Sequence, residues 1–242
     1  MATTLYDQLE RRILLLDGGF GTMVQGYGLQ EEDYRGQRFA GWPVLLKGCN
    51  DLLALTRPDV VRAIHEKYLQ AGADIIETDS FNANAVSLAD YRLEDCAYEI
   101  SKAAAEIARS AADAFTTRNP QKPRFVAGSV GPTNRTASMS ADVQNPAARE
   151  VTFTQLVAAY TDQVRGLIDG GADILLVETV FDTLNAKAAL WAIDTLCGRL
   201  GRAIPVMVSG TLADASGCPT SNGWRLWPER ASRRTRTQAF PT

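Results

Sequence analysis

Two stretches of this chain end in the same carboxylate–hydroxyl pair, each directly after an apolar run. Residues 72–78 read GADIIET and residues 171–179 read GADILLVET. Apolar runs of this kind between helical stretches are typical of strands buried on both faces of a parallel sheet. Polar residues at the carboxyl ends of such strands lie where α/β folds place their binding and catalytic groups. Glu77, Thr78 and Glu178 are therefore candidate site residues.

Each of the two glutamates has a binding interpretation and a structural one. A carboxylate at the buried end of a strand needs a cation or a hydrogen-bond donor beside it. The ammonium group of a substrate would satisfy that need, and so would loop amides or the guanidinium of Arg135. The pattern favours binding for Glu178 and leaves the two interpretations of Glu77 equally open.

A third carboxylate precedes a glycine turn near the N-terminus. Residues 16–22 read LDGGFGT, which puts Asp17 at the end of another apolar run and Gly18 and Gly19 directly after it. Asp17 would bind a substrate ammonium, and the amides near the two glycines would bind a carboxylate. The alternative is a tight turn in which Asp17 caps a helix. Phosphate binding is disfavoured because no Lys-Ser or Lys-Thr pair follows the glycines.

The chain offers little for nucleophilic catalysis by its own side chains, so no catalytic residue is predicted. His65 is the single histidine and lies within a predicted helix, where a solvated or locally bonded side chain is expected rather than a catalytic base. The cysteines are far apart and form no Cys-x-x-Cys motif, so neither a disulfide framework nor a zinc knuckle is predicted. The first three are expected to be small packed residues; the cysteines are Cys49, Cys96, Cys197 and Cys218.

Apolar runs and helical periods alternate along the chain, which predicts an α/β fold. Five parallel strands are expected near residues 13–17, 74–78, 125–130, 174–178 and 204–209. Helical patterns fill the spaces between them at residues 56–69, 85–115, 152–168 and 184–200. This order implies right-handed crossovers, and hence strands in sequential order with the helices on one outer face of the sheet.

The composition is that of an ordinary globular protein, with 45% hydrophobic and 22% charged residues and a net charge of −3. This weak negative charge gives no reason to expect nucleic acid or an acidic membrane as a partner. No apolar run approaches the roughly 20 residues that span a bilayer. The first residues lack the basic and then apolar pattern of a signal peptide. A cytoplasmic protein without a membrane partner is therefore expected.

The alternating pattern stops at Gly217. Residues 218–242 are rich in arginine and contain two tryptophans, and they show neither a strand period nor a helix period. Only 33 residues follow the fifth predicted strand, whereas a strand–helix–strand unit takes roughly 30 or more. The expectation is an incomplete barrel of about five βα units over residues 1–217, followed by a basic, disordered tail over residues 218–242. A shifted reading frame and a genuine tail both stay open as its origin.

Several stretches together make residues 9–217 resemble the homocysteine S-methyltransferase family. Within that family the chain is most similar to the N-terminal, homocysteine-binding module of cobalamin-dependent methionine synthases. The matching stretches are residues 16–23, 34–36 with 50–53, 72–78, 131–136, 177–183 and 209–217. Each stretch alone is weak, but their combination argues against an unrelated barrel enzyme that shares only a glycine turn and acids at the strand ends.

The resemblance implies a (βα)8 TIM barrel that binds homocysteine and zinc. Zinc would hold the substrate as a thiolate, which takes a methyl group from methylcobalamin to give methionine. The acids would bind the amino group of homocysteine, and amides of the glycine turn would bind its carboxylate. The implied substrate-binding residues are Asp17, Gly18, Gly19, Glu77, Thr78 and Glu178.

The chain departs from the family in its cysteines. The family takes its zinc from three cysteines on later strands, two of them adjacent, whereas here only Cys218 follows Cys197. No metal ligand is therefore predicted, and the chain by itself is expected to be inactive. The folate- and cobalamin-binding modules of the full enzyme lie outside these 242 residues. The alternative to an enzyme is a non-catalytic fragment or an interaction protein that another chain complements.

Overall fold

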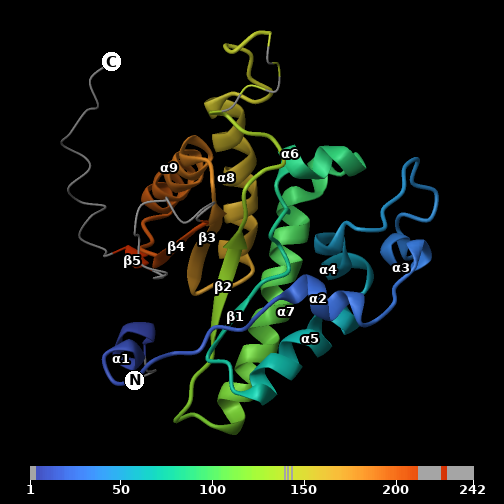
Figure 1. Cartoon of the computed structure of the whole chain (residues 1–242). Coiled ribbons are helices and arrows are strands. Elements are labelled where there is room, and N and C mark those ends of the chain that lie inside the picture. The colour runs from blue at the N-terminus through green and yellow to red at the C-terminus, as the bar shows by residue number, and fades with distance from the viewer. Residues whose placement is uncertain (1–3, 139, 141, 143, 212–224, 228–242) are drawn as a thin grey trace, which may run out of the picture.

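The computed structural model describes residues 4–138, 140, 142, 144–211 and 225–227 (Figure 1). Helices and strands alternate through most of this part of the chain. The described elements are α1 (Leu5–Leu9), α2 (Phe20–Gln25), α3 (Glu31–Arg35), η1 (Asn50–Leu52), α4 (Leu53–Thr56), α5 (Pro58–Ala71), β1 (Ile75–Glu77), α6 (Ala85–Leu88), η2 (Ala89–Tyr91), η3 (Glu94–Cys96), α7 (Ala97–Arg118), β2 (Phe125–Val130), α8 (Phe153–Asp169), β3 (Ile174–Val180), α9 (Thr183–Leu200), β4 (Val206–Gly210) and β5 (Arg225–Trp227).

The strands form one sheet in the order β1-β2-β3-β4-β5. From β1 to β4 each strand pairs parallel to the next one along the chain, which confirms four of the five predicted strands. β5 lies within residues 218–242, where no strand was predicted, and it runs antiparallel to β4. The sequential parallel order is that of a partial (βα)8 barrel.

The strand predicted at residues 13–17 is shorter than expected. It amounts to a single parallel bridge between Leu16 and Ile75. The carboxylate of Asp74 accepts a hydrogen bond from the Leu15 amide at 3.0 Å. In a longer strand ladder, this amide would donate to a backbone carbonyl of the neighbouring strand instead. The amides of Asp74 and Ile75 both donate to the Leu15 carbonyl, at 2.8 and 3.0 Å, and keep the segment beside β1.

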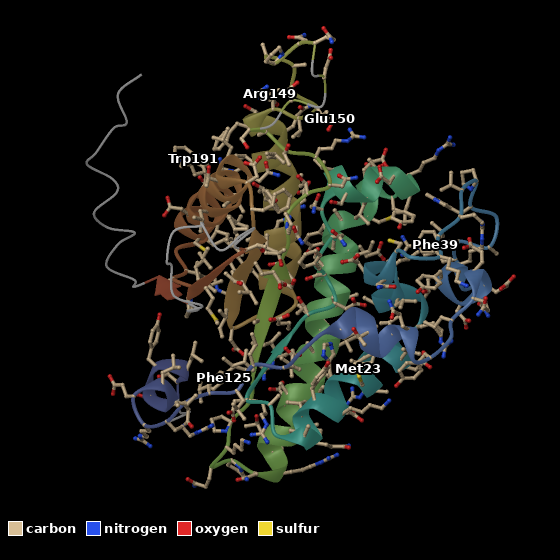
Figure 2. The ribbon with its side chains drawn as sticks, in the orientation of Figure 1. Met23, Phe39, Phe125, Arg149, Glu150 and Trp191 are labelled. Atoms are coloured by element: carbon tan, nitrogen blue, oxygen red, sulfur yellow. The ribbon has the colours of Figure 1, made fainter. Side chains whose placement is uncertain are left out.

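The long helices cover one face of the sheet. α7, α8 and α9 lie side by side in Figure 1, and α5 packs against α7. Alternate strand residues face these helices, among them Ile76, Val126, Leu175 and Val177. The residues between them face the barrel interior, among them Ile75, Phe125, Ala127, Ile174 and Leu176, which form a core cluster with Leu5 of α1. Figure 2 shows Phe125 at the end of the sheet where α1 lies.

The segment from α2 to α4 adds a separate core on the outer side of α5. His65 lies in this core and is fully buried, with its ring centroid 5.3 Å from that of Phe20. Burial lowers the pKa of His65 to about 3, so the imidazole is neutral at physiological pH. The expectation of a solvated or locally bonded histidine is therefore wrong, because α2 covers the face of α5 that carries it.

Two helices show how well local signals predict the ends of elements. α8 begins with the predicted capping box, in which the Thr152 hydroxyl accepts from the Gln155 amide at 3.2 Å and the Gln155 side chain accepts from the Thr152 amide at 2.9 Å. The helical region predicted over residues 85–115 is divided into α6, two 3-10 turns and α7.

None of the described helices is long and apolar enough to cross a membrane.

Candidate functional site

Three carboxylates lie near one another at the carboxyl ends of the strands. Glu77 is the last residue of β1, and Glu178 lies two residues after Leu176 of β3, so both continue the rows that face the barrel interior. Asp17 follows the bridge at Leu16, and its carboxylate accepts a hydrogen bond from the Glu77 amide at 3.0 Å. We call Asp17, Glu77 and Glu178 the acid cluster.

Burial raises the pKa of every member of the acid cluster. Burial, with a smaller contribution from the charge of Glu178, raises the pKa of Asp17 to about 7, against the lowering effect of the Glu77 amide. Burial and then the charges of Glu178 and Asp17 raise the pKa of Glu77 to about 9. Burial also raises the pKa of Glu178, and a hydrogen bond from Ser129 opposes that rise. The cluster therefore retains protons at neutral pH where isolated carboxyls would not.

The described part of the chain supplies no cation to the acid cluster. The ion pairs among its residues involve none of the three acids. Arg135, which could have been a structural partner of these acids, is exposed, and its backbone carbonyl accepts a hydrogen bond from Asn185 at 2.9 Å. One oxygen of Asp17 is buried without a hydrogen-bond partner among the residues that the structure describes. The cluster thus has unused capacity for a ligand that carries positive charge and several N–H donors.

An irregularity in β3 and a neighbouring serine hold Glu178. The pairing of β3 with β4 shifts register between Val177 and Val180, and Thr179 has a φ of 55°. A positive φ is a genuine outlier for a β-branched residue, and such bulges re-aim side chains beside functional sites. The hydroxyl of Ser129 donates to Oε1 of Glu178. The sequence pattern did not indicate Ser129 as a site residue, although Ser129 falls on the interior row of β2 that starts at Phe125.

Gly18 and Gly19 form an exposed turn between Asp17 and α2. Asp17 does not cap this helix, because the N-cap is Gly19 and no side chain bonds to the helix start. Tyr68 of α5 holds the turn: its hydroxyl donates to the Gly19 carbonyl at 3.1 Å, and a Cβ on Gly18 would lie 3.4 Å from the same hydroxyl. The charges of Asp17 and then Glu77 add to burial in raising the pKa of Tyr68. Tyr68 is a second residue of the site that the sequence did not indicate.

Among the predicted site residues, Thr78 differs in that its side-chain hydroxyl both donates and accepts hydrogen bonds within the protein. It is buried, and its hydroxyl lies 2.6 Å from that of Ser80 and accepts a hydrogen bond from the Ser129 amide at 2.9 Å. The three acids and the glycine turn come together at one place, whereas the hydroxyl of Thr78 lies in a network beside them.

The described residues do not fit a zinc site built from cysteines. Cys49 is buried, and burial raises the pKa of its thiol far above the usual range, which opposes the thiolate that zinc needs. Cys96 lies in η3 and Cys197 in α9, on separate elements outside the strands. No group of three or more His, Cys, Asp or Glu side chains in the described part of the chain could hold a metal ion.

Replacing Glu77 by Gln should stabilise the ligand-free chain at pH 8. Because its pKa rises from 4.5 to about 9 on folding, the folded chain holds a proton that the unfolded chain loses across this range. The contribution of Glu77 to the free energy of unfolding therefore falls as the pH rises from 4.5 to about 9. Glutamine removes that dependence, so we expect an unfolding temperature about 2–4 °C higher, as about 1 kcal/mol gives in a domain of this size.

Thermal unfolding followed by circular dichroism at several pH values between 5 and 8 would measure this effect. The gain over the wild type should shrink toward pH 5. Glu150→Gln, at an exposed position just before α8 (Figure 2), is the matched control and should change nothing. A gain from Glu77→Gln that stays the same across the pH range would contradict the buried, protonated state of Glu77.

Comparison with known proteins places this chain in a family. The family model for homocysteine S-methyltransferase matches residues 14–226. The fold is similar to crystal structures of the homocysteine methyltransferase MmuM from Escherichia coli. The metallated form has 26% sequence identity, a TM-score of 0.64, and coverage of 87% of this chain and 67% of its own chain. The apo form has 25% identity, a TM-score of 0.57, and coverage of 85% and 62%. This chain thus spans about two thirds of the length of these structures.

Proposed function

Since this chain belongs to the homocysteine S-methyltransferase family, we propose that the acid cluster binds the ammonium group of homocysteine. The observation that carries the proposal is the absence of any cation beside three partly buried carboxylates in the described part of the chain. An ammonium group brings one positive charge and three donors to a place where the protein supplies neither. The raised pKa values of Asp17 and Glu77 would return toward ordinary values once that charge is bound.

The glycine turn would hold the other end of the amino acid. Gly18 and Gly19 are exposed directly beside Asp17, and the Tyr68 hydroxyl keeps their turn in place through the Gly19 carbonyl. Backbone amides there would donate to the substrate carboxylate, while the ammonium lies at the acid cluster. This arrangement leaves the sulfur-bearing side chain free to react.

The reaction of the family is methyl transfer to the sulfur of homocysteine, which gives methionine. We assign this chain to the methionine synthase type, whose homocysteine module works with folate- and cobalamin-binding modules and takes the methyl group from methylcobalamin. Zinc would supply an activated thiolate, but the described residues do not fit it, and an unperturbed thiol titrates at about 8.5. We therefore expect the chain by itself to bind homocysteine and to form no methionine.

Isothermal titration calorimetry of the chain with L-homocysteine under reducing conditions tests the proposal. Binding should release protons to the buffer, because carboxyls with raised pKa values must ionise to meet the ammonium. Titrations in two buffers of different ionisation enthalpy would count these protons. N-acetyl-homocysteine, which lacks the ammonium, is the control ligand and should not bind. Equal binding of both ligands would refute the proposed role of the acid cluster, and methionine formed from methylcobalamin would refute the predicted inactivity.

A further inference from the structure

On the side of the sheet where β1 lies, the backbone amide and carbonyl of Ser129 form hydrogen bonds with side chains and not with a neighbouring strand. The ladder between β1 and β2 ends with Glu77 opposite Ala127. Ser129 therefore lies beyond the last paired residue of β1, although it is only 2% exposed. A buried N–H or C=O group without a partner would be costly. Thr78 and Ser80 supply the missing partners from the segment that follows β1.

The hydrogen bonds around Ser129 close into a ring with one consistent direction. The Ser129 amide donates to Oγ1 of Thr78 at 2.9 Å, and the Ser80 hydroxyl donates to the Ser129 carbonyl at 2.8 Å. Because the Ser80 hydroxyl has a single proton, the 2.6 Å contact between the two hydroxyls must use the proton of Thr78. Every donor in the ring therefore has one acceptor, and the protons of both hydroxyls are used within the protein.

A glutamine from the helical layer completes the ring. Gln163 of α8 is fully buried, and its Nε2 donates to the Ser80 carbonyl at 2.7 Å and to the Ser129 carbonyl at 3.4 Å. Its Oε1 is buried, and no described residue forms a hydrogen bond with it. Burying the Gln163 side chain in an apolar layer with its Oε1 unpaired costs stability. This cost indicates that the hydrogen bonds donated by Nε2 have a role in the structure.

Ser129 links the hydrogen-bonded ring to the acid cluster. Its backbone is held by the ring, while its hydroxyl donates to Oε1 of Glu178. We propose that Thr78, Ser80 and Gln163 form a positioning network that sets Ser129 and, through it, aims Glu178 at the ligand. The part of this inference that concerns the ligand rests on the proposed function. Thr78 then acts through Ser129 and not by contact with the substrate.

The test compares Thr78→Val, which keeps the shape of the side chain and removes its hydroxyl, with Ser129→Ala and with the double variant. The first readout is the titration of the Glu178 carboxyl in the ligand-free chain, by NMR with carbon-13-labelled glutamate. The second is the dissociation constant for L-homocysteine. Both single variants should shift the Glu178 titration to higher pH, because the opposing hydrogen bond is weakened or lost. Each should weaken binding by about tenfold.

The double variant and two further substitutions separate positioning from general destabilisation. The double variant should bind no more weakly than Ser129→Ala, since both changes act on one path. Thr78→Ser should restore the wild-type titration. Thr161→Val is the matched control, because among the described residues that hydroxyl bonds only to Val157 of its own helix, at 2.7 Å. If Thr78→Val does not fold, Gln163→Met interrupts the same network from α8 and should produce the same upward shift.

A Glu178 titration that stays at its wild-type position in the folded network variant, while Ser129→Ala moves it, would overturn the inference. Additive losses of affinity in the double variant would also overturn it. Failure of the wild-type chain to bind homocysteine would refute the proposed function alone, because the titration of the ligand-free chain still decides whether the network sets Glu178.

Discussion

A chain in which Glu178 is replaced by Gln should bind L-homocysteine about 10- to 100-fold more weakly than the wild type. The substitution keeps the size of the side chain and a carbonyl oxygen for the Ser129 hydroxyl, and it removes the charge and one acceptor oxygen. A hydrogen bond to a charged group is worth about 1.5–3 kcal/mol, which corresponds to this loss of affinity. Calorimetry at pH 8 would measure it. Asp17→Asn should have an effect of the same size, since Asp17 belongs to the same cluster.

Stability measurements separate this loss from unfolding. Burial raises the pKa of Glu178, so the amide variant relieves an unfavourable carboxylate and should unfold no earlier than the wild type. Glu150→Gln, at an exposed position in the loop between β2 and α8 and outside the acid cluster, should bind homocysteine as the wild type does. Unchanged affinity in Glu178→Gln would show that the ammonium group, if bound, lies elsewhere.

Gly166→Ala should destabilise the chain by about 3 kcal/mol, the upper part of the range for overpacked interiors. Alanine in place of a helical glycine ordinarily stabilises, by about 1 kcal/mol. Here α8 packs against α7 so closely that a Cβ on Gly166 would lie 2.4 Å from the Tyr98 carbonyl oxygen and 3.0 Å from the Lys102 amide nitrogen. Backbone atoms cannot turn aside as a flexible side chain does, so the two helices would have to separate.

Thermal and urea unfolding would measure this change, with an expected decrease in unfolding temperature of about 6–12 °C. Gly198→Ala is the matched control, since Gly198 is an exposed glycine within α9. That variant should be as stable as the wild type or up to about 1 kcal/mol more stable. Equal gains from both substitutions would mean that α7 and α8 do not approach as closely as described.

Local sequence signals predicted the elements that carry the site. Apolar runs set the positions of β1 to β4, and the Thr152–Gln155 capping box marks the start of α8. These signals act over a few residues, through burial and hydrogen bonds to the nearest backbone, so they can be read without knowing the fold. The first predicted strand shows their limit: residues 13–17 have the same apolar character, but a tertiary contact with Asp74 reduces them to one bridge.

The sequence by itself determined that Asp17, Glu77 and Glu178 stand at strand ends, and that parallel strands in order would bring such ends to one edge. Only the tertiary structure decided how these acids are held. Ser129 meets Glu178 across 49 residues of chain, and Gln163 meets Ser80 across 83. The physical reason is that pairing register and the turn of β3 at Thr179 place Glu178, and the packing of α8 against the sheet places Gln163. None of these is encoded in a local period.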